Sequence, residues 1–169
     1  MRRFVTTSMA LLLVGASTVA NSGQTGSQTT LKPEDLRTAL SNLGYEVKES
    51  KSTDGAPMYD VAWSSDDGWK YSMTASISPS GRIAWLVMNL GSTDDVAKVP
   101  KEAFQGLMTE NDAIMPMSYS WHPKLMRFYL NNPVDARDFS PQSLRKGMDT
   151  MIASVKRTAD FWDPAKWKK

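Results

Sequence analysis

The sequence contains no cysteine, and His122 is its only histidine. Without cysteine there is no residue to carry a lipid anchor and no disulfide to brace the fold, so we expect a hydrophobic core alone to hold the chain together. About 130 residues are enough for one such domain. A lone histidine offers no spacing typical of a metal site, because zinc sites combine several ligands. We therefore expect neither a metal nor a cofactor.

Long hydrophobic runs are also missing. No stretch approaches the roughly 20 apolar residues that a transmembrane helix needs, so we expect no membrane span. The longest run, residues 4–16, follows Arg2 and Arg3 and precedes the small residues that end at Ala20. This order predicts an export signal over residues 1–20, cleaved near Ala20, and a periplasmic or extracellular protein. Residues 21–31 are polar and rich in Gly and Ser, which predicts a flexible leader.

The charge balance gives the predicted mature domain no net positive charge with which to attract a polyanion. Without Arg2 and Arg3, the 20 basic residues of the chain become 18, equal to its 18 acidic residues. A domain close to neutral has no long-range attraction for nucleic acid or for anionic lipid. We therefore expect no nucleic-acid partner.

The first half of the chain alternates helix and strand signals. Pro33, followed by two acidic residues and a single leucine stripe, predicts a helix over residues 33–43. Alternating apolar residues separated by turn sequences predict strands over 59–63 and 69–77. The run over 83–90 is apolar at nearly every position, which predicts a central strand covered on both faces. A further short strand is expected over 45–47.

In the second half, Pro100 opens a short amphipathic helix, and two strands over 115–121 and 125–130 follow. Pro116 cannot donate to a sheet ladder, so the first of these strands is expected at an edge or at a bulge. The last helix begins at Pro141, with a Ser N-cap before it. Its core-facing residues are predicted to be Leu144, Met148, Ile152 and Val155.

Together these elements predict an α+β domain over residues 32–163, in the order α-βββ-α-ββ-α, followed by a tail over 164–169. We expect an antiparallel sheet of about five strands, with the N- and C-terminal helices packed on one face and the short middle helix elsewhere.

This order of elements resembles the type III secretion chaperone-like fold, in particular its YbjN-like family. The resemblance is carried by LRTALSNLGYEV, DVAWSSDDGWKYSM, RIAWLVMNL, VPKEAFQGLM and FYLNNPVDARDFSPQSLRKGMDTMIASVKRTADFW. It implies a small, non-enzymatic, often dimeric protein that binds polypeptide segments along apolar strips. The export signal and the neutral charge differ from the secretion chaperones, so we expect the fold and the binding habit without their cytoplasmic role.

Catalytic alternatives rest on few residues. Ser143 and Lys146 match the Ser-x-x-Lys spacing of serine acylases that use a lysine base, although Ser in a first helical turn usually serves the backbone. His122 lies in a predicted turn, and no nucleophile or carboxylate stands at a sequence spacing from it that is typical of a catalytic pair. A small exported hydrolase that uses either group is the first alternative. Acidic pairs at 66–67 and 94–95 and the Asp135–Asp138 segment could lend oxygens to Ca²⁺, but none has the alternating carboxylates of an EF-hand loop.

Aromatic and methionine side chains on the predicted strands are the strongest functional signal. Methionine is over-used on surfaces that adapt to apolar partners, and three helices cannot cover both faces of such a sheet. We expect an apolar binding surface formed by Met115, Met117, Tyr119 and Trp121. The partner would be a polypeptide or a second copy in a homodimer, and the remaining alternative is a carrier of an apolar small molecule.

Overall fold

The computed structural model describes residues 29–167, so the predicted export signal and the leader up to residue 28 lie outside the described residues. The helices are α1 (Pro33–Asn42), η1 (Val96–Lys98), α2 (Lys101–Ala113), α3 (Pro141–Arg157), α4 (Ala159–Trp162) and η2 (Pro164–Lys166). The strands are β1 (Lys48–Lys51), β2 (Pro57–Ser64), β3 (Lys70–Ile77), β4 (Ile83–Ser92), β5 (Ser118–His122) and β6 (Arg127–Asp135).

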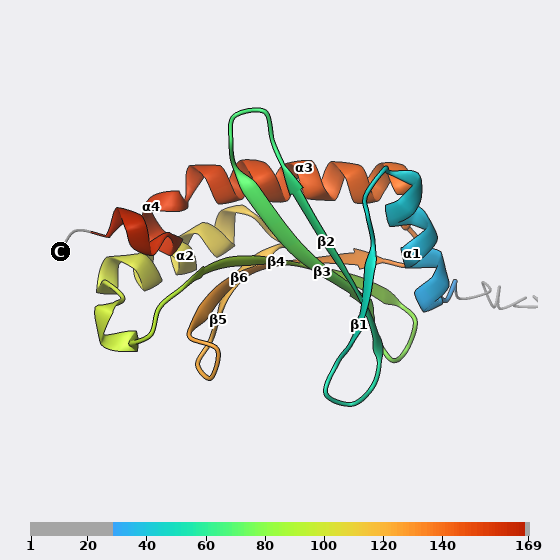
Figure 1. The fold of residues 1–169 in the computed structure, drawn as a ribbon, viewed down its shortest axis with the longest axis horizontal. Coiled ribbons are helices and arrows are strands. Elements are labelled where there is room, and N and C mark those ends of the chain that lie inside the picture. The colour runs from blue at the N-terminus through green and yellow to red at the C-terminus, as the bar shows by residue number, and fades with distance from the viewer. Residues whose placement is uncertain (1–28, 168–169) are drawn as a thin grey trace, which may run out of the picture.

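The strands form one antiparallel sheet in the order β1-β2-β3-β4-β6-β5 (Figure 1). This confirms the predicted α+β class, with six strands in the described part of the chain where about five were expected. The additional strand is β1, which begins at Lys48 rather than within 45–47. β1 forms one edge and has the sequence KESK, whose charges discourage pairing with another chain.

The long helices lie on one face of the sheet. α1 contacts β2 and β3, α3 contacts α1 and β6, and α2 contacts β5 and α4. Phe104 of α2 packs its ring against Trp121 and Phe128, whose side chains face the same side as the buried residues of β6. The expectation that the middle helix lies elsewhere is therefore wrong: α2 shares the face with α1 and α3. In Figure 1, α3 runs along the sheet with α1 at one end and α2 and α4 at the other.

β4 is central, as predicted, but it is covered on one face only. Ala84, Leu86 and Met88 are buried under the helices. The alternate residues face away from the helices, and Trp85 among them keeps 38% of its surface exposed. The apolar run looked like a strand buried on both faces because its outward positions are also apolar.

α3 begins as the sequence predicts. Ser140 is the N-cap, and its hydroxyl accepts the backbone N–H of Ser143. Its fully buried face, however, includes Met151, whereas Ile152 is half-buried at the flank. The helix ends at Arg157, and the buried Thr158 separates it from α4.

The segment predicted as a tail lies on the core as far as it is described. The indole N–H of Trp167 donates to the carbonyl oxygen of Phe161 at 3.0 Å, and its ring meets Phe128 edge-on. At the other end of the chain, Leu31 donates its backbone N–H to the carbonyl oxygen of Gly81 at 2.8 Å.

Candidate functional site

The four residues of the predicted apolar surface, which lie on β5 or just before it, differ in how much of each side chain is exposed. Met117 and Tyr119 alternate toward the helices, and each is only 6% exposed. Trp121 faces the same way at the end of the strand and is half-buried. Met115 precedes the strand and is 79% exposed. Met117 and Tyr119 therefore belong to the core, and the reachable members are Met115 and Trp121.

Tyr119 and Trp121 line a small hollow between α2 and β5, here called the α2–β5 hollow. Its volume is about 220 Å³, and its lining residues are Phe104, Leu107, Met108, Asn111, Tyr119, Ser120, Trp121 and Phe128. Phe104 stands edge-on to Trp121, with ring centroids 5.7 Å apart. Met108 is 71% exposed on α2. The sequence did not single out Phe104 or Met108 as site residues, because nothing in it shows which strand α2 packs against.

Asn111 closes the strand edge beneath this hollow. Its Nδ2 donates to the carbonyl oxygen of Tyr119 at 3.2 Å, and the backbone N–H of Tyr119 donates to its Oδ1 at 2.6 Å. These two bonds occupy the outward backbone groups of Tyr119, which a neighbouring strand would otherwise use. The hollow therefore offers contact with side chains rather than strand addition at this residue.

The Tyr119 hydroxyl ties this site to the C-terminal end of α3. It lies 2.7 Å from the hydroxyl of Thr158, which in turn donates to the carbonyl oxygen of Ser154 at 2.9 Å. Because Thr158 uses its proton for Ser154, Tyr119 is the donor of the first bond. Burial raises the pKa of Tyr119 to about 12, since the charged phenolate would lose its hydration there. The phenol is thus a neutral structural donor.

A second hollow, the β6 groove, runs between α3, β6 and the segment that leads into β5. Its volume is about 620 Å³. One side is formed by Met115, Pro116 and Met117, and the other by α3 residues from Ser143 to Arg157. Asn132 and Ser154, which are 7% and 2% exposed, are the buried polar residues that line it. The predicted surface is therefore divided between two hollows, with Met115 and Met117 in this one.

Ser143 and Lys146 both line the β6 groove, but the Ser143 hydroxyl has a structural role. It accepts the backbone N–H of Ser140 at 2.9 Å and donates to the carbonyl oxygen of Ser140 at 3.0 Å. A nucleophilic serine must give its proton to a base, and here that proton goes to a backbone carbonyl. Lys146 is exposed on the next turn.

His122 ends β5 at the surface. Its Nδ1 accepts the backbone N–H of Leu125 at 3.2 Å, and its ring approaches Tyr129 edge-on. These contacts close the turn to β6. They bring no carboxylate or hydroxyl nucleophile to the ring, as general-base chemistry would require.

In each of the three acidic segments, one Asp carboxylate forms an ion pair with a Lys or Arg side chain. Lys156 bonds Asp67, Lys98 bonds Asp94, and Arg137 bonds Asp135. Within residues 29–167, no group of three or more His, Asp or Glu side chains is arranged to hold a metal ion.

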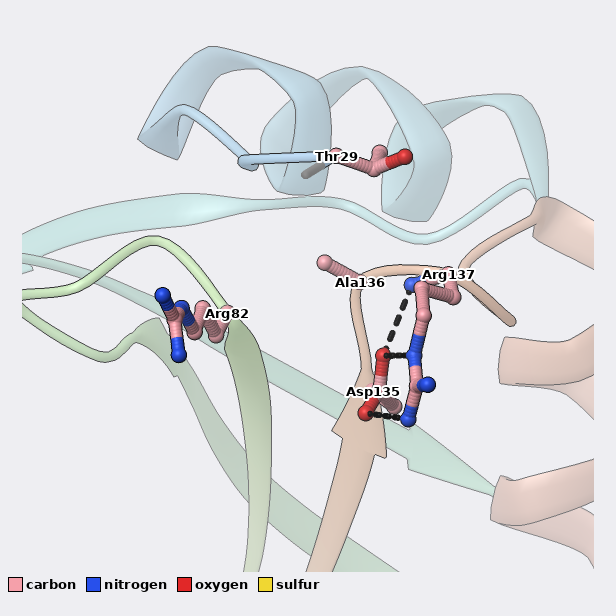
Figure 2. A pocket seen from close by; sticks show the side chains of 5 residues that line it. All are labelled: Thr29, Arg82, Asp135, Ala136 and Arg137. Carbon is pink, nitrogen blue, oxygen red and sulfur yellow. Dashed lines mark hydrogen bonds and ion pairs between the residues drawn. The ribbon is translucent and has the colours of Figure 1, made fainter. Parts of the chain in front are cut away.

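Asp135 and Arg137 lie in a hollow of about 310 Å³, whose other lining residues are Thr29, Arg82 and Ala136. Figure 2 shows these five residues and the hydrogen bonds of the Asp135–Arg137 pair. The guanidinium of Arg137 donates to both carboxylate oxygens, at 2.9 and 2.8 Å. Hydrogen bonds from Arg137 lower the pKa of Asp135 to about 2, so the carboxylate stays charged.

The face of the sheet opposite the helices is open. Its central rows place Trp85 beside Pro133 and Val87 beside Asn131, with Ser76 and Thr74 on the far side. Trp85 is the exposed large apolar side chain of this face among the described residues. No helix in the described part of the chain is long and apolar enough to cross a membrane.

Two solved structures align with this chain. A chain in the crystal structure of the ExsC–ExsE complex aligns with a TM-score of 0.53 at 9% identity, over 74% of this chain and 91% of that chain. A chain in the structure of the HopA1–SchA chaperone-effector complex aligns with a TM-score of 0.49 at 11% identity, over 70% and 85%. No protein-family model matches the sequence, and no curated protein matches it. The fold of this chain is thus shared with a chain of the ExsC–ExsE complex, at an identity that shows the fold alone.

Proposed function

We propose that this protein is a non-enzymatic binding protein that holds apolar side chains of another polypeptide in the α2–β5 hollow. The observation that carries the proposal is the pairing of an exposed Met108 with a hollow lined by Phe104, Trp121 and Phe128. Methionine is flexible and polarizable, so it adapts to side chains of different shape. Aromatic residues in a partly desolvated hollow are typical anchors of protein interfaces.

The size of the hollow favours a polypeptide over a small apolar ligand. Small-molecule sites are about 300–1,000 Å³ and enclose most of the ligand. The α2–β5 hollow, at about 220 Å³, is smaller and lies at the surface. It suits one or two side chains of a longer chain whose remainder stays outside.

Two resemblances support the proposal. The fold is shared with a chain of the ExsC–ExsE complex, which is a protein in contact with another polypeptide. The sequence also resembles the YbjN-like family, and we propose membership on the basis of the strand, acidic loop and Ser-Pro helix over 128–162.

We infer that binding takes place outside the cytoplasm. The support is the order of charge, apolar run and small residues over 1–20. Mass spectrometry of the exported fraction should find a chain that begins at or near Asn21. A chain that keeps Met1 and is recovered only from the cytoplasm would contradict this part of the proposal.

The open sheet face supports a second copy as a further partner, because Trp85 lies exposed at its centre. Sedimentation of the wild type and of Trp85→Ser tests this. A dimer that Trp85→Ser dissociates would support self-association, and a monomeric wild type would contradict it.

The polypeptide proposal is tested with reduced, carboxymethylated α-lactalbumin, a chain that cannot refold. We expect the wild type to bind it and Met108→Asp to bind at least tenfold more weakly, because the new carboxylate must lose hydration without a partner. Thr109→Asp adds the same charge at the next exposed position of α2 and should bind like the wild type. No binding by the wild type, or equal loss in both variants, would contradict the proposal.

Ester or peptide turnover that disappears in His122→Ala or Ser143→Ala would favour the hydrolase instead.

A further inference from the structure

Asn132 is a buried residue whose side-chain amide has no partner. It lies on β6 toward the helices, is 7% exposed and lines the β6 groove. Among the described residues, no hydrogen bond joins its side chain to another group. Its amide atoms are not fully buried, since the hydroxyl of Tyr71 is the one fully buried side-chain polar atom without a partner among the described residues. The amide of Asn132 can therefore be reached from the groove, and its hydrogen-bonding capacity is unused within the described part of the chain.

Neighbouring asparagines show what such an amide does elsewhere in this chain. Asn131, one residue earlier on the opposite face, donates to the carbonyl oxygen of Ser118 at 3.0 Å and to the hydroxyl of Ser120 at 2.8 Å. Asn111 bonds both the N–H and the C=O of Tyr119. In both cases an asparagine side chain bonds the backbone of an extended segment.

The sheet leaves room for an extended segment beside Asn132. β5 pairs with β6 only as far as Ser118 opposite Asn131, whereas β4 continues to pair with β6 as far as Asp135. Residues 132–135 of β6 therefore have no strand on the β5 side. That stretch is about 13 Å long at 3.3 Å per residue, which is the length of three to four extended residues.

The backbone at this edge cannot by itself hold a new strand. Pro133 has no N–H, so the ladder that strand addition would build is incomplete. A side-chain amide with one donor group and one acceptor group can supply the missing bonds. Gly147 of α3 makes room for this amide, because a Cβ at position 147 would lie 2.8 Å from the Nδ2 of Asn132.

We propose that the β6 groove holds a short extended segment of a polypeptide, and that the side-chain amide of Asn132 hydrogen-bonds one of its peptide groups. Met115 and Met117 supply an apolar wall for the side chains of that segment. The two hollows lie along one stretch of chain, since Met117 lines the groove and Tyr119 lines the α2–β5 hollow. The inference rests on the proposed polypeptide-binding function. It adds to that function a polar site that hydrogen-bonds the backbone of the bound polypeptide.

The test compares Asn132→Leu with Asn131→Leu in the full chain. Replacing an unpartnered amide by an apolar group of similar size should leave the melting temperature unchanged or raise it. The same replacement at Asn131 removes two bonds within the protein and should lower the melting temperature. Binding of carboxymethylated α-lactalbumin should show the opposite pattern: roughly tenfold weaker for Asn132→Leu, as expected for lost hydrogen bonds, and unchanged for folded Asn131→Leu.

A second readout identifies the backbone as the group that is bound. A binding heptapeptide would be selected from fragments of α-lactalbumin and remade with single N-methylated peptide bonds. We expect one N-methylation to weaken binding to the wild type and to have no effect on Asn132→Leu, which has already lost the partner.

The outcomes separate this inference from the proposed function. If the wild type binds α-lactalbumin and Asn132→Leu binds equally well, the groove proposal is wrong and the α2–β5 proposal stands. If Asn132→Leu lowers the melting temperature as much as Asn131→Leu, Asn132 is structural and the inference is also wrong. If the wild type binds no unfolded chain, both proposals fail together.

Discussion

Gly106 shows how a single missing methyl group sets the packing of the C-terminal segment. A Cβ at this position of α2 would lie 2.6 Å from the ring of Phe161, so the helix accepts the ring only because the residue is glycine. Gly91 plays the same part on β4, where a Cβ would lie 2.2 Å from the backbone oxygen of Trp162. Both glycines let α4 lie close to the rest of the domain.

Gly106→Ala should therefore destabilise the protein although alanine favours helices. We expect the overpacked ring to cost roughly 1–3 kcal/mol of the free energy of unfolding. In a Phe161→Ala background the ring is gone, and the same change should instead stabilise by roughly 0.5–1 kcal/mol through helix propensity. Urea unfolding of the four proteins measures both effects. The same sign in both backgrounds would show that Phe161 does not rest on Gly106.

Tyr119 should give the protein a measurable dependence on alkaline pH. Burial raises its pKa to about 12, against about 10 in the unfolded chain, so between these values the folded state holds a proton that the unfolded state has lost. The free energy of unfolding should be steady below pH 10 and fall as the pH rises toward 12. Tyr119→Phe should lose about 1 kcal/mol at neutral pH with its bond to Thr158, and should fall less steeply above pH 10. Parallel curves above pH 10 would mean that the phenol is not buried in solution.

Residue patterns predicted which side chains share a face better than which face is covered. Met117, Tyr119 and Trp121 alternate to one side of the chain, but that side faces the helices, and Met117 lines a different hollow from Tyr119 and Trp121. A strand's alternation does not show which of its two faces the helices will cover, since that depends on chain segments far away. Asn132 was not singled out at all, because an amide without a partner is recognised only once its surroundings are known.

At the scale of elements, the buried face of α3 makes a graded prediction. Met151 is fully buried, so Met151→Ala should cost roughly 2–5 kcal/mol, as large-to-small changes in cores do. Ile152→Ala should cost less than half as much, because the side chain is half-buried, and exposed Lys146→Ala should cost no more than about 0.5 kcal/mol. Chemical denaturation ranks the three variants. Equal losses at 151 and 152 would mean that the helix is rotated from the face described.

Element positions followed local signals closely where those signals were strong. Pro33, Pro141 and the Ser140 cap placed the starts of two helices, and the turn sequences placed the β2–β3 and β3–β4 hairpins. The pairing of β4 with β6 and the position of α2 depend on contacts between residues that are far apart in the sequence. Local sequence patterns do not predict such contacts. The break between α3 and α4 at Thr158 was missed because apolar periodicity continues across it.

For the molecule as a whole, the helices cover one face, a charged strand closes one edge, and two hollows flank the segment from Met115 to Trp121. One hollow is apolar and aromatic, and the other has a polar floor and a methionine wall. A compact small molecule would occupy only one of these two hollows. An extended polypeptide could use both, which is why we favour it as the partner.

Site-specific photocrosslinking tests the central claim most directly. The photoreactive residue p-benzoylphenylalanine would be placed at Met108, at the mouth of the α2–β5 hollow, or at Ala153, which is exposed on α3. Carboxymethylated α-lactalbumin would be the partner. The account predicts a crosslink from position 108 that excess unlabelled α-lactalbumin removes, and little or none from position 153. Equal crosslinking from both positions, or none from position 108 in a folded protein, would contradict it.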